Sequence, residues 1–222
     1  MKKLFTLIGT VLLSIGVNAQ TTLKVESFRM GIGEHKTITL DLDNSDLADA
    51  AAFCCDIVLP EGVEVMKDIE GAYMFSVSDK DGRAAWPESL VIASAKQSDG
   101  AIRVVCFPKD ASAFIGESGA ILNVPLVASK ELTKGTVEVS VASQEITNTT
   151  GLNTIKPNAS IADLIAFLRG DVNDDDEIDG TDIQEVINVM LQSLYNIDAD
   201  TNEDTVVDGT DIQTVINIML KN

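Results

Sequence analysis

Two twelve-residue segments of the sequence carry oxygen-bearing side chains at the same spacing. Residues 171–192 repeat as residues 200–221, with 14 identities in 22 positions. Ca²⁺ is a hard cation that takes roughly six to eight oxygen ligands, and twelve-residue loops present them from positions one, three, five, seven, nine and twelve. In the first segment these are Asp171, Asn173, Asp175, Glu177 through its carbonyl, Asp179 and Asp182; in the second they are Asp200, Asn202, Asp204, Val206 through its carbonyl, Asp208 and Asp211. A solvated acidic loop would explain the charge but not the duplicated positions, so the repeat predicts two Ca²⁺ sites.

The two segments depart from the usual loop at position six, where a sharp turn favours Gly. Asp176 and Thr205 stand there instead. A β-branched residue enters the left-handed region at a cost of about 1–2 kcal/mol. We therefore expect the second site to bind Ca²⁺ roughly ten-fold more weakly, or to change its loop geometry.

Charge is concentrated around these segments. The chain has a formal charge of −19, and residues 161–222 hold 15 of its 35 acidic residues against two basic ones. Nucleic acids and anionic membranes bind proteins through Lys and Arg, so this composition argues against both as partners. A bound cation would relieve the repulsion within the C-terminal region.

A short helix is predicted after each segment, over Ile183–Leu191 and Ile212–Leu220. In the first, a single apolar face is expected from Ile183, Val186, Ile187, Met190 and Leu191. Position eight of each loop is also apolar, which suits a contact between paired loops. Such short helices are marginal alone, so we expect the region to be largely unfolded without Ca²⁺.

This arrangement resembles the type I dockerin module over about Gly170 to Leu220. The residues that carry the resemblance are the opening Gly170-Asp171-Val172-Asn173 and the Asp at position twelve of each loop. A true EF-hand would need a helix before each loop, whereas Arg169-Gly170 precedes the first. The resemblance implies Ca²⁺-dependent folding and a cohesin-type protein domain as partner. It places the partner-binding residues at loop positions ten and eleven and along the following helix, at Gly180, Thr181, Gln184 and Asn188 and at Gly209, Thr210, Gln213 and Asn217.

The preceding region alternates short apolar segments with turns, which favours a β-sandwich. The predicted strands are Leu23–Phe28, Lys36–Leu42, Phe53–Leu59, Val63–Met66, Leu90–Ala95, Ile102–Phe107, Ala120–Ala128 and Thr136–Val141. The segment 53–63 resembles the early strand of cohesin-like sandwiches in the carbohydrate-binding superfamily, and 99–105 and 118–122 resemble later ones. The fold expected is a mainly β, cohesin-like jelly roll followed by a small all-α dockerin with two calcium loop–helix units.

The N-terminus has the pattern of a secretory signal peptide. Lys2 and Lys3 precede an apolar run from Leu4 to Val17, and Val17-Asn18-Ala19 offers a cleavage site. The run is short for a membrane span, so we expect an exported protein, secreted, periplasmic or at the cell surface, with no transmembrane segment after cleavage. The predicted divisions are 1–19 signal peptide, 20–145 sandwich, 146–168 linker or lead-in, and 169–222 dockerin-like module.

Three cysteines remain in the exported chain. Alternation along their strands turns Cys55 and Cys106 inward, while Cys54 faces the other way. The sequence is compatible with two alternatives, buried thiols or a Cys55–Cys106 disulfide. His35, the single His, lies in a turn-like context, which argues against a catalytic Cys.

The sequence leaves three functions to compare. The first is a non-catalytic assembly protein that docks onto a cohesin and serves polysaccharide breakdown outside the cell. The second is an accessory protein whose sandwich binds a polysaccharide, with Trp86, Tyr73 and Phe75 as candidate stacking residues. A glycosidase is disfavoured, because it requires two carboxylates paired across a cleft and residues 20–160 show no such pair.

Overall fold

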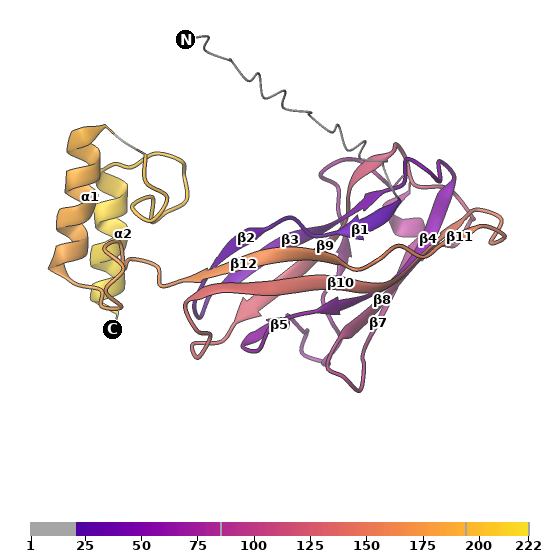
Figure 1. The fold of residues 1–222 in the computed structure, drawn as a ribbon, viewed down its shortest axis with the longest axis horizontal. Helices are drawn as coiled ribbons and strands as arrows, with labels where there is room; N and C mark the ends of the chain where they lie inside the picture. The colour runs from indigo at the N-terminus through magenta and orange to yellow at the C-terminus, as the bar shows by residue number, and fades with distance from the viewer. Residues whose placement is uncertain (1–20, 85, 194, 222) are drawn as a thin grey trace, which may run out of the picture.

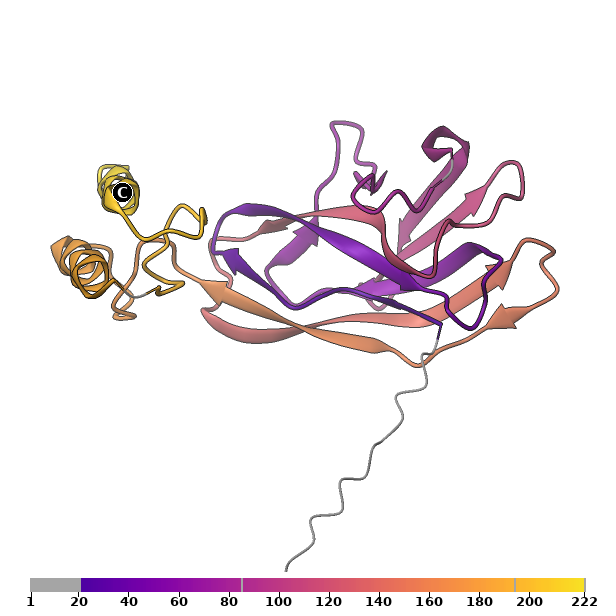
Figure 2. The same cartoon turned by 90° about the horizontal axis from the view of Figure 1, so that it is seen from above.

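The computed structural model describes residues 21–84, 86–193 and 195–221, so the predicted signal peptide at 1–19 lies outside the described residues. A two-layer β-sandwich is followed by a helical module at one end of it (Figures 1 and 2). The strands are β1 (Thr22–Lys24), β2 (Phe28–Gly31), β3 (His35–Asp43), β4 (Ala50–Val58), β5 (Val63–Val65), β6 (Ser76–Val77), β7 (Leu90–Lys96), β8 (Ile102–Pro108), β9 (Ser118–Ala128), β10 (Gly135–Asn148), β11 (Thr154–Ile155) and β12 (Ser160–Phe167). The predicted β-rich N-terminal region is confirmed.

The strands form two sheets that enclose one apolar core. One sheet has the order β1-β3-β9-β5 with β6 beside β9, and the other has the order β2-β12-β10-β4-β8-β7 with β11 beside β10. Alternation sends Phe53, Cys55 and Ile57 of β4 into the core, opposite Val104 and Cys106 of β8. Apolar side chains of β3 and β9 close the core from the other sheet.

The predicted linker over 146–168 does not match the structure. β10 continues to Asn148, and β12 pairs antiparallel with β10 and parallel with β2 in the interior of the seven-stranded sheet. Residues 161–168, the end of this predicted linker or lead-in, are therefore mostly strand. Its inward residues Ala162 and Leu164 are buried, whereas Ile161 is 64% exposed. Sandwich structure thus extends to Phe167, directly before the helical module.

β10 contains a bulge that ties the two sheets together. Its register shifts between Ala142 and Glu145, where Ser143 has a φ of 48°. The buried Gln144 accepts a hydrogen bond from Leu23 N at 2.7 Å and donates one to Leu23 O at 2.9 Å, although Leu23 belongs to β1 of the other sheet. The bulge explains why the strand pattern is interrupted where a linker was predicted.

The helical module consists of α1 (Gly180–Gln192) and α2 (Gly209–Met219). Both helices were predicted, but each begins three residues earlier than expected. A small core of Val172, Val186, Val189, Ala199 and Val215 lies between them. Leu191, predicted to join the apolar face, is 79% exposed, and Val189 is buried instead. In the described part of the chain no helix combines the length and apolar character needed to cross a membrane.

Candidate metal centre

The first acidic segment closes into a compact loop around the carboxylates of its positions one and twelve. Asp171 accepts the N–H of Asp175 at 3.0 Å and that of Asp176 at 3.1 Å, one on each oxygen. Asp182 accepts Val172 N at 2.7 Å and Asp179 N at 2.8 Å. The loop is therefore held shut by backbone donors gathered on two buried side chains.

The second segment repeats this geometry residue by residue. Asp200 accepts the N–H groups of Asp204 at 3.1 Å and Thr205 at 2.9 Å. Asp211 accepts Thr201 N and Asp208 N, both at 2.8 Å. The sequence repeat is thus a repeat of local structure.

Positions four and six of each loop have left-handed backbone. The φ angles are 64° at Asp174, 68° at Asp176, 60° at Glu203 and 71° at Thr205. Position six, where Asp176 and Thr205 replace the usual Gly, is therefore left-handed in both loops, as a sharp turn there requires. The strain falls most heavily on Thr205, because its β-branched side chain fits this region poorly.

Position nine of each loop is the N-cap of the following helix. The side chain of Asp179 accepts both the N–H and the hydroxyl of Thr181, at 2.7 and 2.6 Å. Both bonds lower the pKa of Asp179, and the bond from the hydroxyl has the larger effect. Asp208 and Thr210 form the same cap. Position twelve completes a capping box in both helices, so the loop also fixes where its helix begins.

The predicted ligand atoms of each loop are all oxygens, which suits a hard cation such as Ca²⁺. Asp182 and Asp211 are fully buried and Asp171 and Asp200 nearly so, whereas positions three, five and nine are exposed. Within the described residues, no three acidic, His or Cys side chains converge as a preformed metal cluster. Amide and carbonyl oxygens, which such a cluster would not contain, are part of the predicted ligand set.

A cation already lies at the first loop, and it belongs to the sandwich. The ammonium of Lys134, in the turn between β9 and β10, lies 2.9 Å from Asp171 Oδ2 and 2.8 Å from Asp174 Oδ1, and it also pairs with Asp176. Hydrogen bonds to Asp174, Asp176 and Asp171 raise the pKa of Lys134. Lys134 thus stands where positive charge is favoured, which supports the fit of these residues to a cation.

Three further basic residues join the sandwich to the helical module. Arg169 pairs with Glu34 of the sandwich and with Glu203 of the second loop. Arg29 pairs with Asp198, and Lys36 with Glu203. Among the described residues, the polar contacts between the two parts involve the loops and the segment around 197–203, not α1 or α2. Sequence reasoning missed all four basic residues, because spacing along the chain carries no signal for contacts across a fold.

The residues predicted to bind a partner lie in matching places on the two helices. Gln184 donates to Asn188 at 3.2 Å, and Gln213 donates to Asn217 at 3.1 Å. Thr181 and Thr210 are exposed, although their hydroxyls also accept the amides of Asn173 and Asn202. The structure therefore presents two similar polar surfaces, one for each helix.

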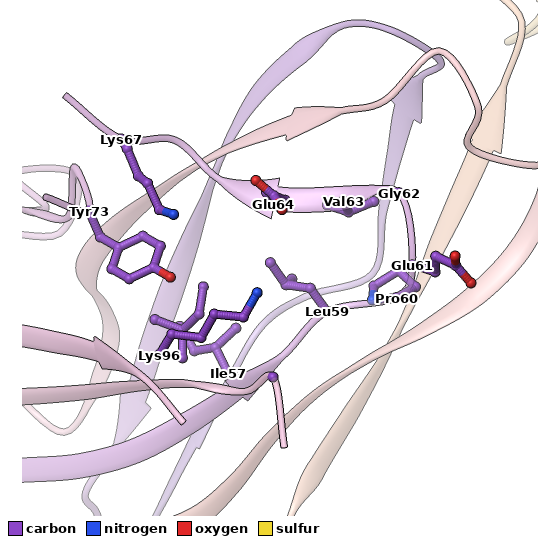
Figure 3. Close-up of a pocket in the computed structure, with 12 residues that line it drawn as sticks. Ile57, Leu59, Pro60, Glu61, Gly62, Val63, Glu64, Lys67, Tyr73 and Lys96 are labelled. Atoms are coloured by element: carbon purple, nitrogen blue, oxygen red, sulfur yellow. The ribbon is translucent and has the colours of Figure 1, made fainter. Parts of the chain in front are cut away.

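The aromatic residues considered for glycan stacking do not form one platform. Tyr73 lines a groove with Leu59, Lys67 and Lys96 (Figure 3), and Lys67 Nζ lies 4.9 Å from the centre of its ring. Phe75 packs beside Tyr73 against the core. Trp86 is 60% exposed but lines a different, shallow depression with Phe114.

Comparison with known proteins separates the two parts of the chain. Residues 169–220 match the dockerin type I domain. This match begins and ends around the two loop–helix repeats, and the region is called the dockerin-like module below. No curated protein matches the sequence.

The sandwich is similar to solved cohesins. The structure of the sixth cohesin from scaffoldin B of Acetivibrio cellulolyticus, in complex with the Cel5 dockerin, has 12% identity and a TM-score of 0.53, and the match covers 66% of this chain and 99% of that chain. A type I cohesin–dockerin complex of OlpA from Clostridium thermocellum has 12% identity, a TM-score of 0.51 and coverages of 66% and 99%. A non-cellulosomal cohesin from the archaeon Archaeoglobus fulgidus has 13% identity, a TM-score of 0.51 and coverages of 70% and 96%. At these identities the likeness establishes a cohesin-like fold for the sandwich.

Proposed function

We propose that this chain is an exported, non-catalytic assembly protein whose dockerin-like module binds two Ca²⁺ ions and docks onto a cohesin-type domain. The observation that carries the proposal is the match of residues 169–220 to the dockerin type I domain, together with two loops of the same internal geometry. The oxygen donor set of each loop supports Ca²⁺ as the ion. Export rests on the signal-peptide pattern of residues 1–19.

Each ion would be held by the same positions of its loop. Asp171 and Asp200, already buried, would provide the inner carboxylates, and Asp182 and Asp211 would close the opposite side. The remaining ligands are Asn173, Asp175, the carbonyl of Glu177 and Asp179 in the first loop, and Asn202, Asp204, the carbonyl of Val206 and Asp208 in the second. The bound ion would supply positive charge to a loop that otherwise concentrates carboxylates, so ion binding would stabilise the folded module.

Docking is assigned to the polar surfaces that follow the loops. Gly180, Thr181, Gln184 and Asn188 form one, and Gly209, Thr210, Gln213 and Asn217 form the other. Since the contacts with the sandwich involve the loops, both helical surfaces stay available to a partner. The two surfaces are related by the repeat, which supports two alternative docking orientations.

A role in polysaccharide breakdown is the biological setting that we propose. Its support is the similarity of the sandwich to a cohesin of a scaffoldin solved with the Cel5 dockerin. We do not extend the proposal to glycan binding by the sandwich itself, because Lys67 covers the ring of Tyr73 and Trp86 lies apart from it.

Calcium-dependent capture of cohesin domains tests the proposal. We expect the full chain to bind at least one member of a panel of purified type I cohesins in millimolar Ca²⁺, and to release it in excess chelator. The double variant Asp182→Ala/Asp211→Ala should bind neither Ca²⁺ nor cohesin, because each change removes a predicted ligand and a buried acceptor of backbone N–H groups. Glu177→Gln is the matched control, since position seven contributes its carbonyl and its side chain is exposed. Cohesin binding that persists in chelator would contradict the proposal.

A further inference from the structure

One end of the sandwich presents cationic side chains to the acidic loops of the dockerin-like module. Of these, Lys134 is the one whose ammonium contacts a predicted Ca²⁺ ligand, Asp171. The Asp171 carboxylate is 1% exposed and Lys134 is 26% exposed, so their contact lies at the mouth of the loop and not in open solvent. The other two contacts of Lys134, with Asp174 and Asp176, involve positions four and six. These positions are not among the ligand positions, so both acids are free to hold the ammonium when the loop holds an ion.

The charge of the first loop explains why a cation from another domain is accepted there. Positions one to twelve of the first loop contain seven acidic residues, against five in the second. Both extra acidic residues are at positions six and seven, where Asp176 and Glu177 correspond to Thr205 and Val206. Lys134 lies against Asp176, and it therefore offsets repulsion that the second loop does not have.

The position-one carboxylate of the second loop has a different neighbour. This carboxylate, Asp200, accepts the phenol of Tyr195 at 3.0 Å, where Asp171 meets an ammonium. Arg169 and Lys36 approach this loop at Glu203, in position four. Two loops with the same internal bonds thus differ in whether their innermost carboxylate faces a neutral hydroxyl or a positive charge.

We propose that Lys134 is a built-in cation of the first loop, through which the sandwich stabilises the ion-free loop and lowers its affinity for Ca²⁺. The inference rests on the proposed Ca²⁺ binding. A charge that stabilises the ion-free loop more than the loaded one weakens ion binding by the same factor. A Ca²⁺ ion held by Asp171 would be repelled by the ammonium that contacts the same carboxylate. With solvent screening, this repulsion corresponds to an affinity loss of about five-fold.

Lys134 acts in the opposite sense to Thr205. Strain at Thr205 weakens the second site, whereas the ammonium weakens the first. In the intact protein the two affinities are therefore closer together than the loop sequences alone predict. The sandwich also couples the ion content of the module to the contact between the two domains.

The experiment compares the full chain with Lys134→Met and with Lys130→Met, a matched control in the same turn. Ca²⁺ is titrated by calorimetry, and the backbone amide signals of Gly180 and Gly209 assign each binding step to its loop. We expect Lys134→Met to tighten the first site about five-fold, to leave the second unchanged, and to lower the melting temperature of the chelated module. The gain in affinity should shrink in high salt, and Lys130→Met should match the wild type.

Two results would count against the inference in different ways. First-site affinity that is unchanged or weaker in Lys134→Met, with both sites still binding Ca²⁺, would overturn the role of Lys134 and leave the proposed function standing. A wild-type chain that binds no Ca²⁺ at either loop would overturn the proposed function itself. Should Lys134→Met disturb the turn, Lys134→Gln provides a second neutral side chain with the same expected sign.

Discussion

At the scale of single residues, the two core cysteines show how burial controls chemistry. Cys55 and Cys106 are fully buried on neighbouring strands, and all three cysteines are free thiols. Burial raises the pKa of Cys106 to about 12 and also raises that of Cys55. Of the two states that the sequence left open, the structure has the thiols, and both stay protonated in the folded protein.

These thiols predict a loss of stability in alkaline solution. In the unfolded chain a thiol ionises near pH 8.5, while in the folded chain Cys55 and Cys106 remain protonated well above it. The unfolded state then binds fewer protons, so the free energy of unfolding falls as pH rises, by about 1.4 kcal/mol per pH unit for each thiol. Denaturant titrations between pH 8 and 10 should show this slope. A Cys55→Ala/Cys106→Ala variant should show a shallower one, and equal slopes would refute the assignment.

The residue scale also marks where sequence reasoning stops. The paired loops could be predicted because the residues of each repeat lie at fixed distances from one another along the chain. Lys134 could not, because its partners lie 37 or more residues away and are brought to it by the turn between β9 and β10. A lone Lys in a turn otherwise reads as an ordinary surface residue.

At the scale of elements, β12 is the longest strand that was not predicted; the short strands β2, β6 and β11 were not predicted either. Ile161 and Ile165 on its outer face are apolar, as is Leu164 on its inner face, so no period-two pattern stands out. The bulge around Gln144 and the hairpin that follows also present the polar composition of a linker. In contrast, β4 and β8 were predictable, because both are rich in apolar residues and each lies beside a turn signal, 60–62 after β4 and 98–100 before β8.

Truncation of β12 tests its place in the sandwich. Leu164→Ala should destabilise the sandwich by about 2–5 kcal/mol, because it leaves a cavity in a fully buried site. Ile161→Ala is the control, since Ile161 is 64% exposed on the same strand. Thermal melts of the full chain should show the loss in the sandwich transition. Similar small shifts for both variants would instead indicate a linker.

The paired helices α1 and α2 predict redundancy in docking. Gln184 and Gln213 are cleaner probes than Thr181 and Thr210, whose hydroxyls belong to the loop network. Gln184→Arg or Gln213→Arg alone should reduce cohesin affinity by no more than about two-fold, because the other surface can still dock. The double variant should reduce it by far more, as binding titrations in Ca²⁺ would measure. Loss of binding from one single change would show that only one orientation is used.

At the scale of the whole molecule, the two domains depend on different interactions for their stability. The sandwich closes over a large apolar core, whereas among the described residues five buried apolar side chains make up the core of the dockerin-like module. The division into a β-rich and a helical region was visible in the sequence as a change of periodicity and charge. The way in which the two regions meet was not.

Chelation should therefore separate the two domains in a melting experiment. With Ca²⁺, calorimetry of the full chain should show the dockerin-like module melting as a stable unit. In excess chelator its transition should move to much lower temperature, because the carboxylates lose their counter-ion. The sandwich transition should shift little, and a sandwich that melts on chelation would contradict this division. Circular dichroism at 222 nm follows the helices separately.

β12 also has a mechanical consequence. It runs along the sandwich and leads directly into the dockerin-like module (Figure 1), so a pull on a docked module enters the sandwich along this strand. β12 is paired at seven positions with β10 and at four with β2. Because those hydrogen bonds run across the strand direction, such a force loads them together in shear and does not peel them one by one. The last strand of the sandwich is thus the member that bears tension when the partner moves.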